Sequence, residues 1–258
     1  MTTDVQRLHR PELREFRERC EAPSAPAVLT GAFDDWPARG WTVDRIAARL
    51  GDASVTPVVL TDGRFEIDLR EGVRVAAMPA REYLDRVRSP GSPGHYLRLQ
   101  LDPPYEDLAR EAPTPRYCTR VVGLKKNLWV GAAGTASDLH YDMTHNLVAQ
   151  VEGRRRVTLF APDQGPRLYP YPARSLNWHH SQVRLDRPDH ERFPAFRGAR
   201  RVEVALDAGE MLFIPRGWWH HFESVDLSIA VNFFWVTPRH LPAIAAAKLA
   251  WAAASIRT

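Results

Sequence analysis

Three residues of this sequence have the types and the spacing of a metal site. His140 and Asp142 are separated by one residue, and His220 follows the segment Gly217-Trp218-Trp219 further along the chain. Side chains at positions i and i+2 of a strand lie on one face, so His140 and Asp142 can reach the same ion. Two imidazoles and one carboxylate suit Fe(II), and three protein ligands leave positions open for a co-substrate and O2. The pattern therefore indicates a divalent metal site that supports oxidation.

His221, next to His220, is the alternative third ligand. Neighbouring residues of a strand point to opposite faces, so only one of the two histidines can face the ion. The two tryptophans before His220 indicate an apolar wall that limits the access of solvent. A chain with ten histidines also produces such a pattern by chance, so the motif by itself leaves the ligand set open.

The elements that must position these residues are mostly strands. Strand-sized runs separated by turns dominate residues 95–237, which is typical of a sandwich or barrel. The expected strands are Tyr96–Leu101, Asn127–Val130, Leu139–Met143, Leu147–Val151, Val157–Phe160, Arg201–Leu206, Met211–Ile214 and Ser228–Trp235. Residues 161–200 show little periodicity, and an insertion of this length is usually functional.

Helices are expected towards the two ends of the chain. The patterns predict helices over residues 11–22, 42–51 and 79–87, and strands over residues 27–30, 55–60 and 65–69. Thr42 is the expected N-cap and Gly51 the C-terminal stop of the second helix. We therefore predict one mainly β domain over residues 1–258, with an N-terminal region at 1–94, a core at 95–237 and a terminal helix at 238–258.

Composition limits the classes of protein that remain. The chain has 258 residues, 44% of them hydrophobic, with a net charge of +4 and two cysteines, Cys20 and Cys118. No apolar run is long enough for a membrane helix or has the form of a secretory signal. We therefore expect a cytoplasmic protein with no membrane partner. Arginines cluster at 154–156 and 197–201; a solvated surface is favoured over a nucleic-acid partner.

Longer segments carry a family resemblance. They are Ser137 to Asp142, Asn146 with Ala149-Gln150, Leu159 to Gln164, Leu168 to Pro172, Ser181 to Val183, Glu191 to Pro194, Gly217 to His221, and Val231 to Phe233. In these segments the chain resembles the JmjC-type, cupin-like Fe(II)/2-oxoglutarate-dependent hydroxylases, and among them the asparaginyl hydroxylase that inhibits hypoxia-inducible factor. The resemblance implies a double-stranded β-helix (jelly-roll) core, Fe(II) as cofactor, 2-oxoglutarate as co-substrate, and His140, Asp142 and His220 as catalytic metal ligands.

The resemblance also implies a pocket for 2-oxoglutarate. The family usually places a lysine fifteen residues after the first ligand, and this chain has Arg155 there, which keeps the positive charge. Arg155 shares strand parity with Val157 and Leu159 and should therefore face the interior, although a solvated basic turn is the alternative. The other polar groups that the resemblance points to in this pocket are Tyr96, Ser137, Asn146 and Asn232.

The implied reaction is the hydroxylation of a C–H bond, with release of succinate and CO2. The preferred substrate is a protein or peptide side chain, followed by a small metabolite and then by a tRNA base. His179 and His180 occupy the positions that hold the target side chain in the asparaginyl hydroxylase, and a surface pair is the alternative. The alternative hypotheses are a non-catalytic cupin that binds a ligand, and a metal-dependent cupin enzyme that works without 2-oxoglutarate. A homodimer through the terminal helix is an alternative to packing of that helix on its own barrel.

Overall fold

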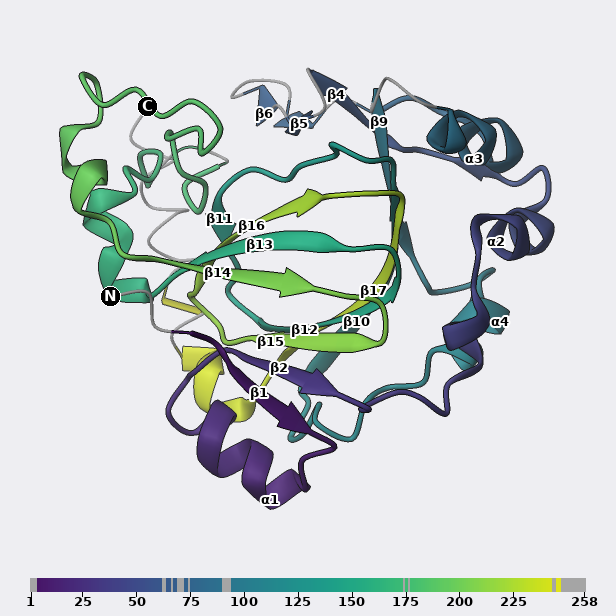
Figure 1. The fold of residues 1–258 in the computed structure, drawn as a ribbon, viewed down its shortest axis with the longest axis horizontal. Helices are drawn as coiled ribbons and strands as arrows, with labels where there is room; N and C mark the ends of the chain where they lie inside the picture. Colours follow the sequence, from purple (N-terminus) through teal and green to yellow (C-terminus); the bar gives the residue numbers. More distant parts are fainter. Residues whose placement is uncertain are drawn as a thin grey trace.

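The computed structural model describes residues 4–61, 64–65, 67–68, 72–73, 75–89, 94–173, 175, 177–242 and 245–246. Within these residues the chain is mostly β, and its strands form two principal sheets that lie against each other (Figure 1). Two further sheets have two short strands each, β3 (Ser54–Val55) with β8 (Met78–Pro79), and β6 (Ile67–Asp68) with β7 (Gly72–Val73).

The larger sheet forms one side of the interior, opposite the smaller sheet. In spatial order its strands are β1 (Gln6–His9), β2 (Ala27–Thr30), β15 (Glu210–Ile214), β12 (His145–Glu152), β17 (Ser228–Val236), β10 (Gly123–Gly131), β9 (His95–Gln100), β4 (Val58–Thr61) and β5 (Arg64–Phe65). Among these described strands, the pairing of β1 with β2 is parallel and the other neighbouring pairs are antiparallel.

The smaller sheet is formed by β11 (His140–Tyr141), β16 (Trp219–Ser224), β13 (Arg155–Phe160) and β14 (Arg201–Leu206), in that order. Between residues 140 and 236 the chain passes repeatedly from one sheet to the other. This alternation is the arrangement of a jelly-roll, and it confirms the predicted fold class.

An apolar core joins the two sheets. Val148, Leu212 and Ala230 of the larger sheet pack in one buried cluster with Val157 and Leu159 of the smaller sheet. These residues alternate along their strands with residues of the outer faces, as expected for sheets packed face to face. The inward face of each strand is therefore fixed by its apolar residues, and any polar residue of the same parity is carried into the interior.

Helices cover the other face of the larger sheet. They are α1 (Leu13–Phe16), followed by a π-helical turn (Arg17–Glu21), α2 (Val43–Leu50), α3 (Ala80–Arg88) and α4 (Glu106–Glu111). Elsewhere in the described chain, short 3₁₀ helices are found at Pro37–Gly40, Pro162–Arg167, Pro194–Gly198 and Pro238–His240. Thr42 caps α2 by accepting a hydrogen bond from the backbone N–H of Arg45, and Gly51 ends the helix, as predicted. None of the described helices has the length and apolar character needed to cross a membrane.

Three predicted strands differ from the structure in their extent. The run at residues 65–69 falls on β5 and β6, which belong to different sheets, and residues 66 and 69 lie outside the described residues. The run at residues 55–60 divides into β3 and β4, which belong to different sheets, because Pro57 lacks the N–H that a continuous ladder needs. The run Leu139–Met143 shortens to His140–Tyr141. The terminal helix predicted at 238–258 begins as the short 3₁₀ helix, and residues 247–258 lie outside the described residues, so this helix stays a prediction.

His145, on the helix-covered face of β12, is a buried histidine with one nitrogen left without a partner. Its Nδ1 accepts the backbone N–H of Arg216 at 3.2 Å, so Nε2 carries the proton, and no hydrogen-bond partner of Nε2 occurs among the described residues. The ring lies between Phe213 and Trp235. Burial, and after it the positive charges of His240 and its neighbours, lowers the pKa of His145 to about 3.

This shift makes the free energy of unfolding depend on pH. Below its ordinary pKa of 6.5, His145 binds a proton in the unfolded chain but not in the folded one, so acid favours unfolding. From pH 7 to pH 5.5 we expect His145 to remove about 1 kcal/mol of stability. Urea unfolding of the metal-free protein at both pH values should show a smaller difference in His145→Gln. The exposed His9, changed to Gln, is the control and should leave the difference unchanged. An unaltered difference in His145→Gln would contradict the assignment.

Candidate metal centre and co-substrate pocket

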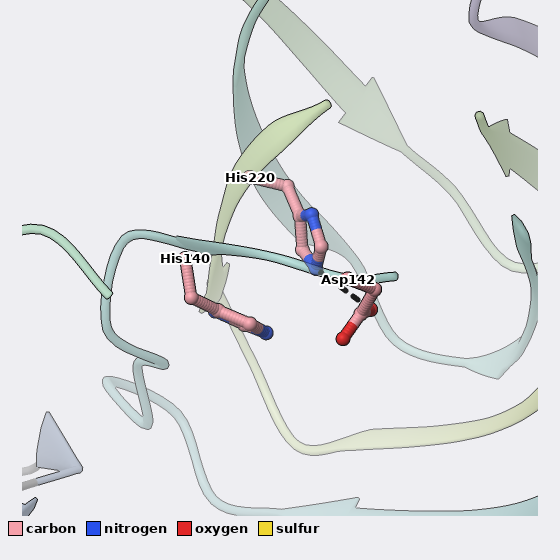
Figure 2. Close-up of side chains that lie close together, drawn as sticks. All are labelled: His140, Asp142 and His220. Carbon is pink, nitrogen blue, oxygen red and sulfur yellow. Dashed lines mark ion pairs between the residues drawn. The ribbon is translucent and has the colours of Figure 1, made fainter. Parts of the chain in front are cut away.

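The pairing of β11 with β16 brings the three predicted metal ligands together. His140 and His220 are cross-strand partners, and Asp142 follows β11 directly. One ligand atom from each residue lies within 4.8 Å of the other two. Figure 2 shows the two imidazoles and the carboxylate directed toward one another from different strands of the smaller sheet. Residues that are eighty positions apart in the sequence therefore meet because of strand register alone.

The backbone sets which nitrogen of each histidine faces the site. Nδ1 of His140 lies 2.9 Å from the carbonyl oxygen of Asp138, and Nδ1 of His220 lies 3.0 Å from that of Trp218. A carbonyl oxygen only accepts, so each Nδ1 must carry the proton. In the neutral ring Nε2 then has the free electron pair, which is the tautomer that binds metal. Burial, and then the charge of His140, lowers the pKa of His220 to about 4 and favours this neutral form.

Asp142 completes a group of acceptor atoms that cannot satisfy one another by hydrogen bonds and that need a cation between them. Its Oδ2 is buried, receives no hydrogen bond among the described residues and lies 3.5 Å from Nε2 of His220. Electron pairs from two imidazoles and one carboxylate thus converge with no proton between them. A buried acceptor left unsatisfied costs about 1–3 kcal/mol, and a divalent ion removes this cost. The residues present therefore fit a divalent metal held by two histidines and one aspartate.

His221 does not belong to this group. It pairs across the sheet with Thr158, whereas His220 pairs with His140 and Leu159. His221 is buried, and among the described residues the group of ligand atoms within 4.8 Å of one another contains His220 and not His221. The expectation from strand parity is confirmed.

Arg155 points into the interior, as its parity with Val157 predicts. It is 3% exposed, whereas the side chains of Arg154 and Arg156 are 57% and 58% exposed. Its Nε donates to Oγ of Ser228 at 2.8 Å, and its Nη2 donates to the hydroxyl of Tyr96 at 3.1 Å. The alternative of a solvated basic turn is wrong for Arg155 and holds for the two neighbouring arginines.

This buried guanidinium forms no ion pair with a carboxylate of the described residues. The hydrogen bonds that Arg155 donates among the described residues go to hydroxyl oxygens, and its guanidinium carbon lies 5.7 Å from the centre of the ring of Phe222. A buried charge without a counter-ion is costly, so the arrangement fits a site in which the ligand brings the negative charge. Arginine can hold a carboxylate with two parallel hydrogen bonds. The far carboxylate of 2-oxoglutarate is such a ligand.

Tyr96 and Ser137 lie against the same part of the interior. Tyr96 is 5% exposed and contacts Arg155 directly, and burial raises the pKa of its hydroxyl. Ser137 accepts the backbone N–H of Phe222, whose ring packs on Arg155. The two hydroxyls are thus near the guanidinium, either by direct contact or through Phe222. Their part in binding 2-oxoglutarate stays a prediction.

The two predicted asparagines are buried but differ in their contacts. Asn146, 3% exposed on β12, has an Oδ1 that no hydrogen bond of the described residues reaches. Asn232, 5% exposed on β17, accepts the indole N–H of Trp129 at 2.8 Å. Oδ1 of Asn146 therefore has no partner among the described residues, whereas the oxygen of Asn232 is already used by the protein; a part of either asparagine in binding the co-substrate stays a prediction.

The histidine pair of the irregular segment lies beside the metal ligands. The ring of His180 stacks on that of His140, with centroids 5.1 Å apart and planes at 15°, and its Nδ1 is 3.8 Å from Oδ2 of Asp138. His179 packs against Trp178 and Tyr141. Burial is the first cause that lowers the pKa of His179 to about 4 and that of His180 to about 2. Contact of either histidine with substrate stays a prediction.

Sequence reasoning missed two residues of the interior, Ser228 and Gln150. Both are 0% exposed, and Nε2 of Gln150 donates to Oγ of Ser228 at 2.9 Å. Gln150 carried a signal, because it lies in a segment that matches the family and shares parity with Asn146. Ser228 begins a strand and matches no motif, so only the register of β17 places it beside Arg155.

Comparison with known proteins agrees with this geometry. A family model described as a cupin-like domain matches residues 13–240. The chain therefore belongs to the cupin-like JmjC family, whose members use Fe(II) and 2-oxoglutarate. It is similar to lysine-specific demethylase 8 of Xenopus tropicalis, with 32% identity over 240 residues that cover 90% of this chain and 53% of that protein.

Other relatives carry different names. Lysine-specific demethylase JMJ30 of Arabidopsis thaliana is 32% identical over 221 residues, which cover 83% of this chain and 50% of that protein. The tRNA wybutosine-synthesizing protein 5 of Danio rerio is 30% identical over 236 residues, which cover 84% and 69%. The chain spans about half the length of the two demethylases. The likeness to the asparaginyl hydroxylase stays a prediction.

Proposed function

We propose that this chain is an Fe(II)- and 2-oxoglutarate-dependent oxygenase that hydroxylates a C–H bond of a protein or peptide side chain. One atom of O2 enters the substrate and the other enters succinate, and the first carbon of 2-oxoglutarate leaves as CO2. Bound Fe(II) with its co-substrate supplies the oxidising chemistry. The observation that carries the proposal is the pair of unsatisfied features, three converging ligand atoms and a buried arginine without a carboxylate.

The protein's own residues have two tasks in this reaction. His140, Asp142 and His220 hold the metal and leave positions open. Arg155 fixes the far end of the co-substrate, so that its keto-acid end is presented to the metal. Trp219 packs with Phe160 and Leu168 on the other face of β16, and this buried cluster covers the back of the strand that carries His220.

A protein side chain is favoured as substrate by two features. Two similar proteins are named lysine-specific demethylases, which supports a side chain of a protein. Tyr141 and Trp178 form an edge-to-face pair 5.7 Å apart, both are only half-buried, and both rings contact His179. Such rings offer the apolar surface that would orient an extended side chain near the metal.

The arginine clusters do not form an open cationic surface that would favour tRNA. Four of their members are exposed and lie beside carboxylates of the chain. The pairs are Arg154–Asp207, Arg156–Glu223, Arg200–Asp163 and Arg201–Glu203. Pairing within the chain reduces the charge that is left for phosphates, so a tRNA base remains the third choice.

Two measurements test the proposal. Anaerobic addition of Fe(II) and 2-oxoglutarate should produce a weak visible charge-transfer band, and O2 should then release succinate. Peptides with unmodified and methylated lysine, small metabolites and tRNA are compared as stimulators, and the largest stimulation is expected from a peptide. Metal-loaded protein that gives neither the band nor succinate would show a non-catalytic binding module instead.

A further inference from the structure

Ser228, the first residue of β17, lies at the centre of a buried polar network. Its Oγ is 2.8 Å from Nε of Arg155 and 2.9 Å from Nε2 of Gln150, and Ser228 and Gln150 are both 0% exposed. The network links β12 and β17 of the larger sheet to β13 of the smaller sheet, around the buried charge of Arg155. A serine in this position is sheltered from solvent on every side.

The direction of these hydrogen bonds is determined by chemistry. Nε of arginine can only donate. The amide nitrogen of Gln150 is identified because it lies 2.7 Å from the carbonyl oxygen of Glu152, and an oxygen there would face another acceptor. Ser228 therefore accepts two hydrogen bonds and uses both its lone pairs. Its own O–H proton remains, and no hydrogen bond of the described residues takes it.

Arg155 has N–H groups left over beside this hydroxyl. A guanidinium has five, and the described residues accept one from Nε and one from Nη2. The remaining N–H groups and the proton of Ser228 are thus unused donors in one buried region. One buried acceptor of this network, Oε1 of Gln150, also lacks a partner among the described residues. The unused donors outnumber it, which favours an anionic ligand, and a carboxylate has two oxygens with which to satisfy them.

Two glycines hold the network in place. Gly131 pairs across the sheet with both Tyr96 and Ser228, and a Cβ there would lie 2.9 Å from the ring of Tyr96. Gly153 has a positive φ of 75°, and a Cβ there would lie 2.0 Å from the carbonyl oxygen of Leu227. The turn before Arg155 therefore packs directly on the residue before Ser228, which fixes both donors relative to each other.

We propose that Ser228 donates its hydroxyl proton to the far carboxylate of the 2-oxoglutarate that Arg155 binds, and that Gln150 is the residue that positions Ser228. The inference rests on the proposed function for the identity of the ligand. Since the two lone pairs of Ser228 accept hydrogen bonds from Gln150 and Arg155, its hydroxyl proton is directed away from both residues. Arg155 and Ser228 together then make the site selective for a keto acid with a second carboxylate at the right distance.

The test compares two keto acids that differ only at the far end. 2-Oxoglutarate and 2-oxopentanoate have the same metal-binding end, but only the first has a second carboxylate. Their dissociation constants are measured by calorimetry with the Mn(II)-loaded protein, which needs no turnover. Ser228→Ala should bind 2-oxoglutarate about tenfold more weakly, since a hydrogen bond to a charged group is lost. Its affinities for 2-oxopentanoate and for Mn(II) should equal those of the wild type.

Controls separate direct contact from a purely structural role. Thr158→Val removes a buried hydroxyl from the other face of β13 and should change neither dissociation constant. In an Arg155→Lys background, Ser228 no longer receives the Nε bond but keeps the bond from Gln150, so an effect of Ser228→Ala on 2-oxoglutarate that is absent for 2-oxopentanoate must come from the far carboxylate. A further loss of affinity for 2-oxoglutarate in that background is expected. No further loss there, or equal losses for both keto acids, overturns the inference. Wild-type protein that fails to bind 2-oxoglutarate at all overturns the proposed function itself.

Discussion

Asp142→Asn is expected to weaken metal binding strongly and, at the same time, to stabilise the metal-free protein. The carboxylate is a stronger metal ligand than an amide, so the affinity for Mn(II) should fall at least about a hundredfold, and succinate release should be lost with it. In the metal-free protein, the new amide nitrogen can donate to Nε2 of His220, from which Oδ2 of Asp142 is now 3.5 Å away. Satisfying these two groups should raise the free energy of unfolding by about 1 kcal/mol.

The opposite signs of the two effects make this result diagnostic. A residue that only supports the fold would lower the free energy of unfolding when changed, and a surface residue would alter neither quantity. Urea unfolding without metal and titration with Mn(II) measure the two effects separately. Asp163→Asn, which removes an exposed carboxylate paired with Arg200, is the matched control and should leave Mn(II) affinity intact. Wild-type affinity for Mn(II) in Asp142→Asn would exclude Asp142 as a ligand.

Strand periodicity was sufficient to predict which way the residues of this site face. The alternation of side chains placed His220 apart from His221, and Arg155 apart from the neighbouring arginines, and the structure confirms both. These predictions succeed because one face of each strand is buried against the other sheet. A slip of one residue would expose the apolar set, so the register is strongly determined.

Features that depend on pairing between distant strands were not visible in the sequence. The prediction of one strand at 55–60 failed because the apolar run concealed the effect of Pro57. Ser228 was missed for a different reason, since its importance arises from contacts with Gln150 and Arg155 on other strands. Hydrogen bonds between residues more than seventy positions apart have no local pattern that could reveal them.

Arg155→Met is expected to raise the KM for 2-oxoglutarate by about a hundredfold or more, because truncating one partner of a buried charge pair costs about 2–5 kcal/mol of binding. The free energy of unfolding of the ligand-free protein, in contrast, should stay the same or rise. Methionine fills a similar volume without a buried charge, and such replacements are often neutral or stabilising by about 1–4 kcal/mol in the ligand-free protein. Arg155→Lys should lie between the two, since lysine keeps the charge but lacks the fork of donors that reaches Ser228 and Tyr96.

The matched control for this change lies one residue away. Arg156→Met alters the same residue type on the same strand, but Arg156 is exposed and pairs with Glu223 on the other face, so the KM should not change. Initial rates of succinate release over a range of 2-oxoglutarate concentrations give the KM, and urea unfolding gives the stability. If Arg155→Met kept the wild-type KM while losing stability, the guanidinium would be a structural cation satisfied by hydroxyl groups alone. A raised KM with unchanged or increased stability would show that the counter-ion of Arg155 is the co-substrate. In that case Arg155 is needed to bind 2-oxoglutarate but adds nothing to the stability of the fold.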